Sequence, residues 1–392
     1  MLFTLEALEA KHGDCLILHY GPADAPRFIL IDGGPSGVYK TRLGPRLAAL
    51  KGRWHPEQAL PLRMLMVSHI DDDHIQGVLD LTSMLVECRE DGRPLPYQIR
   101  AVWHNGFDDI LGNKDDELFA SLSASVRPAA AGGTLPPDLA LSRPAAMVVA
   151  SIGQGRSLRD HVTRLGISLN PPSRGLVMAP GTGPKATSWG DGLRLTVLGP
   201  RQERIEALHR EWEREIKKRG WASDAEGRAL AASYTDNSVF NLSSLIVLAE
   251  MGDRRMLLPG DARGDDILAG LQSAKLLRSG TCHLDLLKLP HHGSNRNVET
   301  DFFRQVTADR YVISANGEYG NPEDETLQMI SEARGKADFT LSLTNRDGKN
   351  DLGKRLRDFF AAEKSRGRKY RVVFRKATAP SLKVDLLDPV GY

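Results

Sequence analysis

A short polar segment that directly follows a predicted buried strand holds the side chains best suited to chemistry. Residues 68–77 read SHIDDDHIQG, and a turn there can direct His69, Asp71, Asp73 and His74 into one volume. Imidazole nitrogens and carboxylate oxygens gathered so closely are typical of a site for a divalent cation. The alternative is a solvated acidic loop at a helix start, because carboxylates also favour the positive end of the helix dipole.

Other His and Asp side chains follow further predicted strands. Asp32 and His104 each come after a strand in the first third of the chain, and Asp261, His291 and His292 follow strands in the last third. Sites on a β framework are commonly built from loops at separate strand ends. These later clusters favour a metal site over a solvated acidic loop.

The elements that must position these groups alternate between strands and helices. Apolar runs of strand length are separated by turn residues, and helical apolar spacing marks several segments between them. The predicted strands cover residues 3–9, 15–20, 28–31, 62–67, 97–103, 193–198, 245–249, 255–258, 284–289, 311–314 and 371–374. Predicted helices cover residues 42–51, 75–86 and 203–219, and Asn321-Pro322-Glu323 is typical of a helix start.

The stretch from about 105 to 236 differs from the rest of the chain in composition and in hydrophobic periodicity. Residues 127–146 are rich in Ala, Pro and Gly with little periodicity, which predicts a loop. We expect an inserted helical and loop region that covers the candidate site and includes a returning strand. The chain then divides into a first half at 1–104, the insertion at 105–236, and a second half at 237–392 with a basic C-terminal segment.

The composition is that of a folded, water-exposed protein. Of 392 residues, 41% are hydrophobic and 26% charged, and 52 basic against 50 acidic residues give no global field that would attract a polyanion. No apolar run approaches the ~18 residues of a membrane span. The three cysteines, Cys15, Cys88 and Cys282, are too few and scattered for a disulfide framework. We therefore expect a cytoplasmic protein without a membrane partner.

Several motifs, in order along the chain, resemble those of the metallo-β-lactamase superfamily. Residues 69–74 resemble its His-x-His-x-Asp-His signature, with Asp71 in the second His position. Residues 31–34 (IDGG), 258–261 (LPGD) and 288–294 (KLPHHGS) resemble its later landmarks. Three further motifs are Gly13-Asp14-Cys15, Asn241-Leu-Ser-Ser-Leu245, and Asn316 before Tyr319-Gly320. With them, the chain is similar to the hydrolase domain of ComEC-type competence proteins over residues 1–104 and about 237–325.

The resemblance implies a fold and a ligand set. The fold would be an α/β protein, the four-layer αβ/βα metallo-β-lactamase sandwich. One divalent metal would be held by His69, Asp71 and the residue in the third-His position, which here is Asn241. A second would be held by Asp73, His74 and one of His291 and His292, with Asp261 bridging the two.

Two departures change the expected metal preference. Asp71 and Asn241 make the first site richer in oxygen than in imidazole, which weakens the preference for zinc and leaves manganese or magnesium open. His104 could supply the missing imidazole, or it could be packed or face the substrate. We expect one or two divalent ions, Zn or Mn, with Mg also open.

Metal-assisted hydrolysis follows from such ligands. A metal-bound hydroxide needs no Ser or Cys nucleophile, and neither a Gly-x-Ser-x-Gly motif nor a phosphate-binding Gly-rich loop competes with this interpretation. The residues expected to act directly are Asp73, His291 and His292, one histidine of that pair being free to protonate a leaving oxygen. Supporting or substrate-facing roles are expected for Asp32, His104, Lys288, Ser294 and Asn316.

The expected activity is that of a phosphodiesterase or nuclease acting on nucleic acid or nucleotides. Residues 354–376 carry ten basic against two acidic side chains and could track the backbone of single-stranded nucleic acid, although such segments are commonly no more than a solvated face. Two alternatives remain open: an ester, thioester or lactone hydrolase, and a catalytically silent metal-binding regulatory module. The sequence leaves the oligomeric state undetermined.

Overall fold

The strands form two eight-stranded sheets. The computed structural model describes residues 1–106, 109–110, 143–173, 175–219 and 243–392. The first sheet has the order β16-β1-β2-β3-β4-β6-β7, with β5 also paired to β4. Its strands are β1 Leu2–Leu8, β2 Leu16–Gly21, β3 Arg27–Ile31, β4 Leu60–Met66, β5 Tyr97–Ile99, β6 Ala101–Trp103, β7 Ser168–Leu169 and β16 Ser381–Asp385.

The second sheet has the order β15-β14-β13-β12-β11-β10-β9-β8. Strands β11 to β15 run parallel, and β8 to β11 are antiparallel. Their bounds are β8 Thr187–Ser188, β9 Leu193–Gly199, β10 Ile246–Met251, β11 Arg254–Leu258, β12 Cys282–Lys288, β13 Val306–Ile313, β14 Thr340–Leu343 and β15 Arg371–Phe374. The parallel strands place their carboxyl ends at one edge of the sheet.

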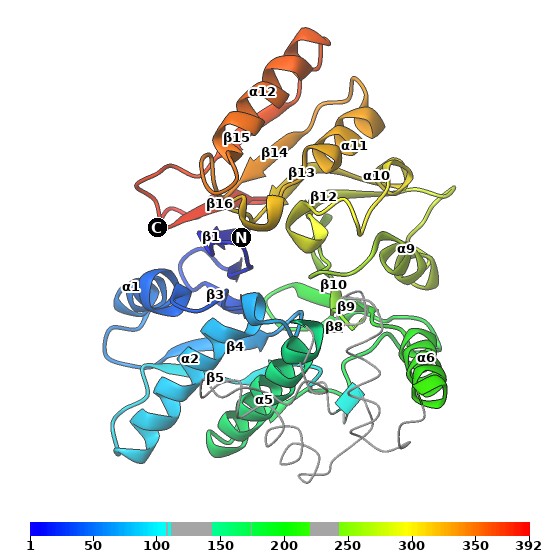
Figure 1. Cartoon of the computed structure of the whole chain (residues 1–392). Helices are drawn as coiled ribbons and strands as arrows, with labels where there is room; N and C mark the ends of the chain where they lie inside the picture. The colour runs from blue at the N-terminus through cyan, green and yellow to red at the C-terminus, as the bar shows by residue number, and fades with distance from the viewer. Residues whose placement is uncertain (107–108, 111–142, 174, 220–242) are drawn as a thin grey trace, which may run out of the picture.

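Helices cover the outer face of each sheet (Figure 1). Helices α1 Gly44–Trp54, α2 Asp72–Glu90 and α5 Arg143–Arg164 lie on the first sheet, and α9 Gly264–Ser273, α10 Thr300–Gln305, α11 Asp324–Arg334 and α12 Leu352–Ser365 lie on the second. Helix α6 Gln202–Arg219 follows β9, and the short helices are η1 Tyr39–Leu43, η3 Pro290–Gly293 and η4 Glu318–Gly320. Among the described helices, none combines the length and apolar composition needed to cross a bilayer.

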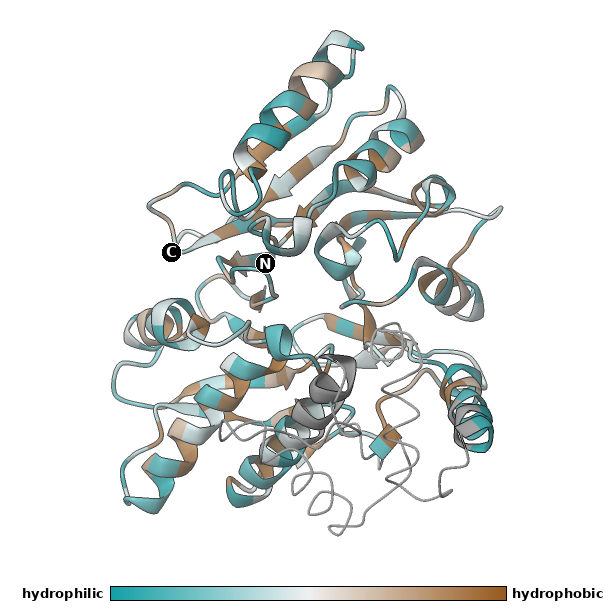
Figure 2. Cartoon of the chain, in the orientation of Figure 1, coloured by the Kyte–Doolittle hydropathy of each residue, from teal (hydrophilic) through white to brown (hydrophobic). Residues whose placement is uncertain are grey.

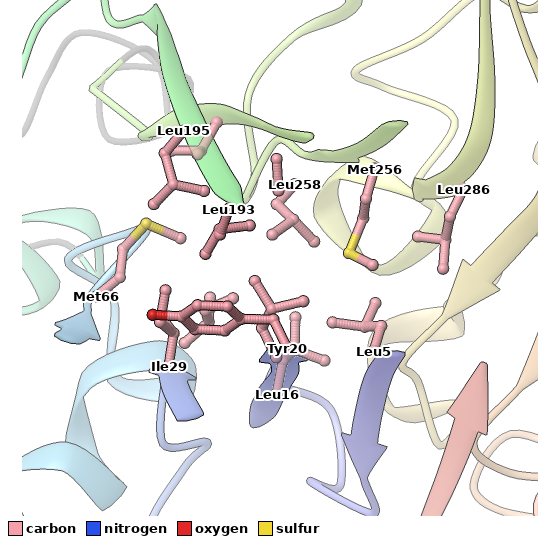
Figure 3. Packing of buried hydrophobic residues seen from close by; sticks show 14 of the residues in the cluster. Leu5, Leu16, Tyr20, Ile29, Met66, Leu193, Leu195, Met256, Leu258 and Leu286 are labelled. Atoms are coloured by element: carbon pink, nitrogen blue, oxygen red, sulfur yellow. The ribbon is translucent and has the colours of Figure 1, made fainter. Parts of the chain in front are cut away.

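The strand alternation creates three apolar interfaces. Leu5 and Tyr20 of the first sheet pack against Leu195, Met256 and Leu286 of the second, between the sheets (Figure 3). The opposite strand faces pack against the helices, and the outer helix surfaces are hydrophilic (Figure 2). The layer order is therefore helix, sheet, sheet, helix, which confirms the predicted four-layer αβ/βα sandwich.

The structure refines several sequence expectations. Residues 105–236 contribute to both sheets, because β7 extends the first sheet and β9 pairs with β10 of the second. Helix α11 begins at Asp324 with Glu323 as its N-cap, so the predicted start, with Asn321 as the cap and Pro322 as the first helical residue, is two residues too early. The reason is that Glu323 is tied to the loop after β12: its N–H donates to the Gly293 carbonyl at 3.1 Å. The three cysteines are buried free thiols.

Candidate metal site

Loops at neighbouring strand ends bring the predicted residues together. Asp14 lies in the β1–β2 turn, and Asp32 directly follows β3. His69 and Asp71 lie in the loop between β4 and α2, and Asp73 and His74 lie in the first turn of α2. Asp261 follows β11, and residues 291–292 follow β12. Since β3 and β4 are parallel, and β11 and β12 are parallel, each pair delivers its loops to one edge of its sheet. The candidate site forms where these two edges meet.

Asp32 fixes the orientation of His74. Its Oδ1 accepts the Ser68 N–H at 2.7 Å, and its Oδ2 accepts the Ser68 hydroxyl at 2.5 Å. The same Oδ2 lies 3.0 Å from Nδ1 of the fully buried His74 ring. A carboxylate can only accept, so Nδ1 carries the proton and Nε2 presents a lone pair. This arrangement is typical of metal-ligating histidines.

His292 is oriented in the same way by a backbone carbonyl. Its Nδ1 donates to the Ser314 oxygen at 3.1 Å and lies 3.5 Å from Asp14 Oδ1. The Lys288 ammonium is buried and pairs with Asp14 Oδ2. Lys288 thus supports the site from within the protein and is not exposed to a substrate. Nε2 of His292 is buried and has no hydrogen-bond partner among the described residues.

Two histidines and two carboxylates converge at the site, each histidine Nε2 lying near Asp261 and near one oxygen of Asp73. His74 Nε2 lies 3.2 Å from Asp261 Oδ1 and 3.9 Å from Asp73 Oδ1. His292 Nε2 lies 3.4 Å from Asp73 Oδ2 and 3.7 Å from Asp261 Oδ1. Donors bound to one zinc ion in a tetrahedron stand about 3.3 Å apart. Within the described part of the chain, His74 Nε2, His292 Nε2 and Asp261 Oδ1 are buried without hydrogen-bond partners, so the residues fit a divalent metal ion.

Asp14 also lies close to His74, Asp261 and His292, but its oxygens face other groups. One donor atom from each of Asp14, His74, Asp261 and His292 lies within 4.8 Å of the others. One Asp14 oxygen pairs with Lys288, however, and the other faces Nδ1 of His292, away from the unpartnered Nε2. Asp14 is therefore better placed to orient His292 than to bind the same ion.

Asp261 also presents an oxygen to a second region. Its Oδ2 lies 3.7 Å from Nε2 of His291, whose side chain is 31% exposed. Asn297 Nδ2 donates to the Asp261 backbone oxygen at 3.0 Å, so Asn297 Oδ1 must accept from His291 Nδ1 at 2.7 Å. His291 therefore also directs Nε2 toward the site, from its solvent-facing side.

His69 and Asp71 lie beside the cluster with a different arrangement. The Asp71 N–H approaches His69 Nδ1 at 3.4 Å, and in a neutral ring this leaves the proton on Nε2. Burial lowers the pKa of His69 to about 4. Burial raises the pKa of Asp71 to about 7, with the charges of Asp73 and Asp261 adding to the effect. In this state His69 and Asp71 are therefore less suited to bind an ion than Asp73, His74, Asp261 and His292.

The buried carboxylates of the cluster favour positive charge on the neighbouring histidines. Burial lowers the pKa of His74, but the charges of Asp261 and Asp73 outweigh it and hold that pKa well above its usual value. Burial likewise lowers the pKa of His292, and Asp14 and Asp261 reverse the effect and raise it to about 9. Protons on these rings offset the buried carboxylates; a divalent ion would offset them without protons.

The backbone at the histidine pair is unusual. His291 (φ 48°, ψ 46°) and His292 (φ 55°, ψ 18°) are both left-handed, a conformation that costs roughly 1–2 kcal/mol per non-glycine residue. The turn is held because the His291 N–H donates to the Gly260 oxygen at 3.2 Å and the Ser294 N–H donates to the His291 oxygen at 2.9 Å. Strain maintained by surrounding contacts is concentrated at functional sites.

Three other predicted residues lie outside the cluster. His104 packs against α5, where a Cβ on Gly155 would lie 3.3 Å from its Nε2, and its buried ring has no hydrogen-bond partner among the described residues. Ser294 donates to Glu323 at 3.2 Å, and Asn316 Oδ1 accepts the Glu318 N–H at 3.0 Å, so both shape loops around the site. Asn241 lies outside the described residues.

The basic segment at 354–376 is partly engaged in internal contacts. Arg355 bonds to the Gly320 oxygen at 2.8 Å, Arg368 bonds to the Gly335 oxygen at 2.8 Å, and Arg366 pairs with Glu363 at 2.9 Å. These side chains hold α12 and its neighbours together. Binding of nucleic acid by this segment stays a prediction.

Three residues that shape the site have no role predicted from the sequence: Asp14, Ser68 and Asn297. Asp14 and Ser68 both lie within recognisable motifs, and the available sequence signal for Asp14 is an acid that follows a glycine in a turn-like segment. Asn297 follows the histidine pair by five residues in an irregular loop, so its reach back to His291 and Asp261 has no local sequence signature.

Comparisons with known proteins add little. No family model and no curated protein matches the chain. Among solved structures, a mutant of the CmlA beta-hydroxylase matches with a TM-score of 0.36 and 10% sequence identity. The match covers 97% of this chain and 54% of the hydroxylase, so the chain spans about half the length of that protein. A likeness this distant carries no inference about activity.

The layer order and the cluster together define a class. The chain is a four-layer αβ/βα protein with a buried His/Asp site, between the two sheets' loop edges, that can hold a divalent metal ion.

Proposed function

We propose that the chain is a metal-dependent hydrolase of the metallo-β-lactamase type, acting on phosphodiesters. The observation that carries the proposal is the convergence of His74 Nε2, His292 Nε2 and Asp261 Oδ1, all buried and unpartnered within the described chain. An Asp73 oxygen lies 3.9 Å from the first of these nitrogens and another lies 3.4 Å from the second. The choice of phosphodiester rests on the resemblance of residues 288–294 to the last motif of the ComEC-type hydrolase domain.

The side chains divide into holding and proton-moving roles. We assign Asp73, His74, Asp261 and His292 to one divalent ion, Zn or Mn, with Mg as a weaker candidate because of the two imidazoles. A second ion would draw on the free oxygen of Asp261 and on His69 and Asp71. Such an ion supplies a Lewis acid for a phosphoryl oxygen and lowers the pKa of water toward ~7.

His291 is placed to exchange a proton with the substrate. Asn297 occupies its Nδ1, and its Nε2 lies on the partly exposed side of the cluster. A histidine fixed at one nitrogen and open at the other is suited to protonate a leaving oxygen. Asp32 and the Ser314 carbonyl keep His74 and His292 in orientation while this happens.

Two neighbouring carboxylates provide a direct test. Asp73 belongs to the cluster, whereas Asp72 is exposed and accepts a hydrogen bond from Gln154 at 2.8 Å. We expect Asp73→Asn to lose stoichiometric metal and to reduce hydrolysis more than ~100-fold, beyond the 10–100-fold typical of residues that only support a ligand. Asp72→Asn should keep both metal and activity.

The assay combines metal analysis of the purified chain with removal and return of Zn, Mn and Mg. Turnover is measured on single-stranded DNA, RNA, a small phosphodiester and a carboxylic ester. Hydrolysis of the carboxylic ester alone would replace the phosphodiesterase by an ester hydrolase. Metal binding without turnover of any substrate would indicate the regulatory module. Equal behaviour of the two variants would refute the assigned site.

A further inference from the structure

One aromatic side chain in the loop after β13 is largely exposed to solvent. Tyr319 is 65% exposed, and the only other large hydrophobic residue found exposed among the described residues is Met1. The ring meets that of His12 edge to face, with centroids 5.2 Å apart and an interplanar angle of 82°. A single exposed apolar side chain is common on protein surfaces, so the exposure of Tyr319 carries weight only together with its backbone conformation and its place beside the site.

The backbone holds Tyr319 in a conformation that a tyrosine rarely adopts. Its φ is 60° and its ψ 10°, in the left-handed region, where a bulky side chain is strained. The Gly317 N–H donates to the Asn321 oxygen and the Gly320 N–H to the Gly317 oxygen, both at 3.0 Å. Arg355 donates to the Gly320 oxygen at 2.8 Å. The loop is thus fixed around an exposed, strained ring.

The same loop is hydrogen-bonded to two segments next to the metal cluster, the histidine turn and the β1–β2 turn. Asn321 Nδ2 donates to the His291 oxygen at 3.4 Å, which joins the loop to the histidine turn. On the other side, Glu318 pairs with His12 at 3.0 Å, and His12 stands two residues before Asp14. His291 is also the partly exposed histidine of the cluster. Tyr319 therefore belongs to a loop that connects the turn of the partly exposed His291 to the β1–β2 turn that carries His12 and Asp14.

We propose that Tyr319, backed by His12, is a stacking platform for a nucleobase of the substrate. This inference deepens the proposed function, on which it rests, by naming nucleotides and single-stranded nucleic acid as the substrate class. Every base offers a π-face, and stacking on an aromatic side chain tolerates any base sequence. An ordered, already strained loop keeps the ring in place, so little conformational freedom is lost on binding.

Two substitutions separate the ring from the backbone strain. Tyr319→Phe keeps the ring and loses the hydroxyl. Tyr319→Asn removes the ring but tolerates the left-handed conformation. His283→Ala is the matched surface control, because His283 is exposed at the opposite end of β12 from the histidine pair.

The readout is the binding affinity of the metal-loaded full chain for two phosphorothioate-linked strands of equal length, which resist hydrolysis. One strand carries bases with a fluorescent analogue, and the other is abasic with an end label. We expect Tyr319→Asn to weaken binding of the base-bearing strand roughly 10- to 100-fold and to leave the abasic strand unchanged. The Tyr319→Phe and His283→Ala variants should bind both strands like the parent.

Three results would overturn the proposal. They are a parent protein that binds both strands equally, a Tyr319→Asn variant that binds like the parent, and a Tyr319→Phe variant as weak as Tyr319→Asn. Failure of the proposed function is distinguishable, because it would show as intact discrimination between the strands without hydrolysis of any phosphodiester.

Discussion

Asp32 orients the His74 ring through Nδ1, the nitrogen on the opposite side of the ring from the metal site. Substitution of Asp32 by Asn keeps the size of the side chain and leaves an oxygen for the Ser68 N–H. The new amide group would donate to His74 Nδ1, which forces the proton of a neutral ring onto Nε2 and removes the lone pair from the site. We expect Asp32→Asn to weaken metal binding 10- to 100-fold with the fold retained.

Titration of the metal-free protein with Zn or Mn measures this effect. Ser68→Ala is the matched control, because it removes one hydrogen bond to Asp32 and preserves the contact between Asp32 and His74. We expect a much smaller loss there. If Asp32→Asn bound metal as tightly as the parent, His74 would not be a ligand through Nε2.

At the scale of elements, the β1–β2 turn is docked onto the start of α2. A Cβ on Gly13 would lie 1.9 Å from the Asp73 backbone oxygen and 2.8 Å from Pro35 Cδ. The Asp14 N–H donates to that same oxygen at 3.2 Å. Gly13→Ala should therefore push apart the two elements that carry Asp14 and Asp73, and a displacement of about 1 Å can cost ~100-fold in rate.

Gly52→Ala is the comparison for that variant. A Cβ on Gly52, in α1, would meet no described neighbour within 4 Å, and alanine favours a helix over glycine by about 1 kcal/mol. We expect Gly52→Ala to keep activity and to melt at the same temperature or higher. Activity and melting temperature measured together check both variants; full activity in Gly13→Ala would contradict the docking.

The sequence predicts elements well where local patterns determine them. Strands such as β3 and β12 show short apolar runs between turn residues, and α2 shows clear helical spacing. The predicted start of α11 is wrong because a contact to Gly293, distant in sequence, decides the conformation of residues 321–323. The ligand-bearing motifs are identifiable from residue type, but the orientation of His291 by Asn297 depends on tertiary structure.

At the scale of the whole molecule, the two ends of the chain meet in the first sheet. Strand β16 pairs antiparallel with β1, with Leu5 opposite Val384. No local pattern specifies such a pairing, because the partners are separated by nearly the whole chain. Glu6 reinforces it from within: it accepts hydrogen bonds from Ser381 of β16, from His19 of β2 at 2.7 Å and from Arg46 of α1 at 2.9 Å.

This buried carboxylate makes folding stability depend on pH. Burial raises the pKa of Glu6, but the hydrogen bond and charge of His19 and the charge of Arg46 outweigh it and lower the pKa from 4.5 to about 2. A carboxyl whose pKa is depressed in the folded state stabilises it above the unfolded pKa. That contribution, on the order of 3 kcal/mol, is lost as the pH falls from about 4.5 toward 2.

Glu6→Gln should therefore be less stable than the parent at pH 6, and the difference should shrink as the pH falls to 3. Chemical denaturation at several pH values measures the free energy of unfolding of both proteins. The exposed Glu57 gives the control, because Glu57→Gln should follow the parent at every pH. Parallel stability curves for the parent and Glu6→Gln would mean that the carboxylate of Glu6 does not hold the two ends of the chain together through its charge.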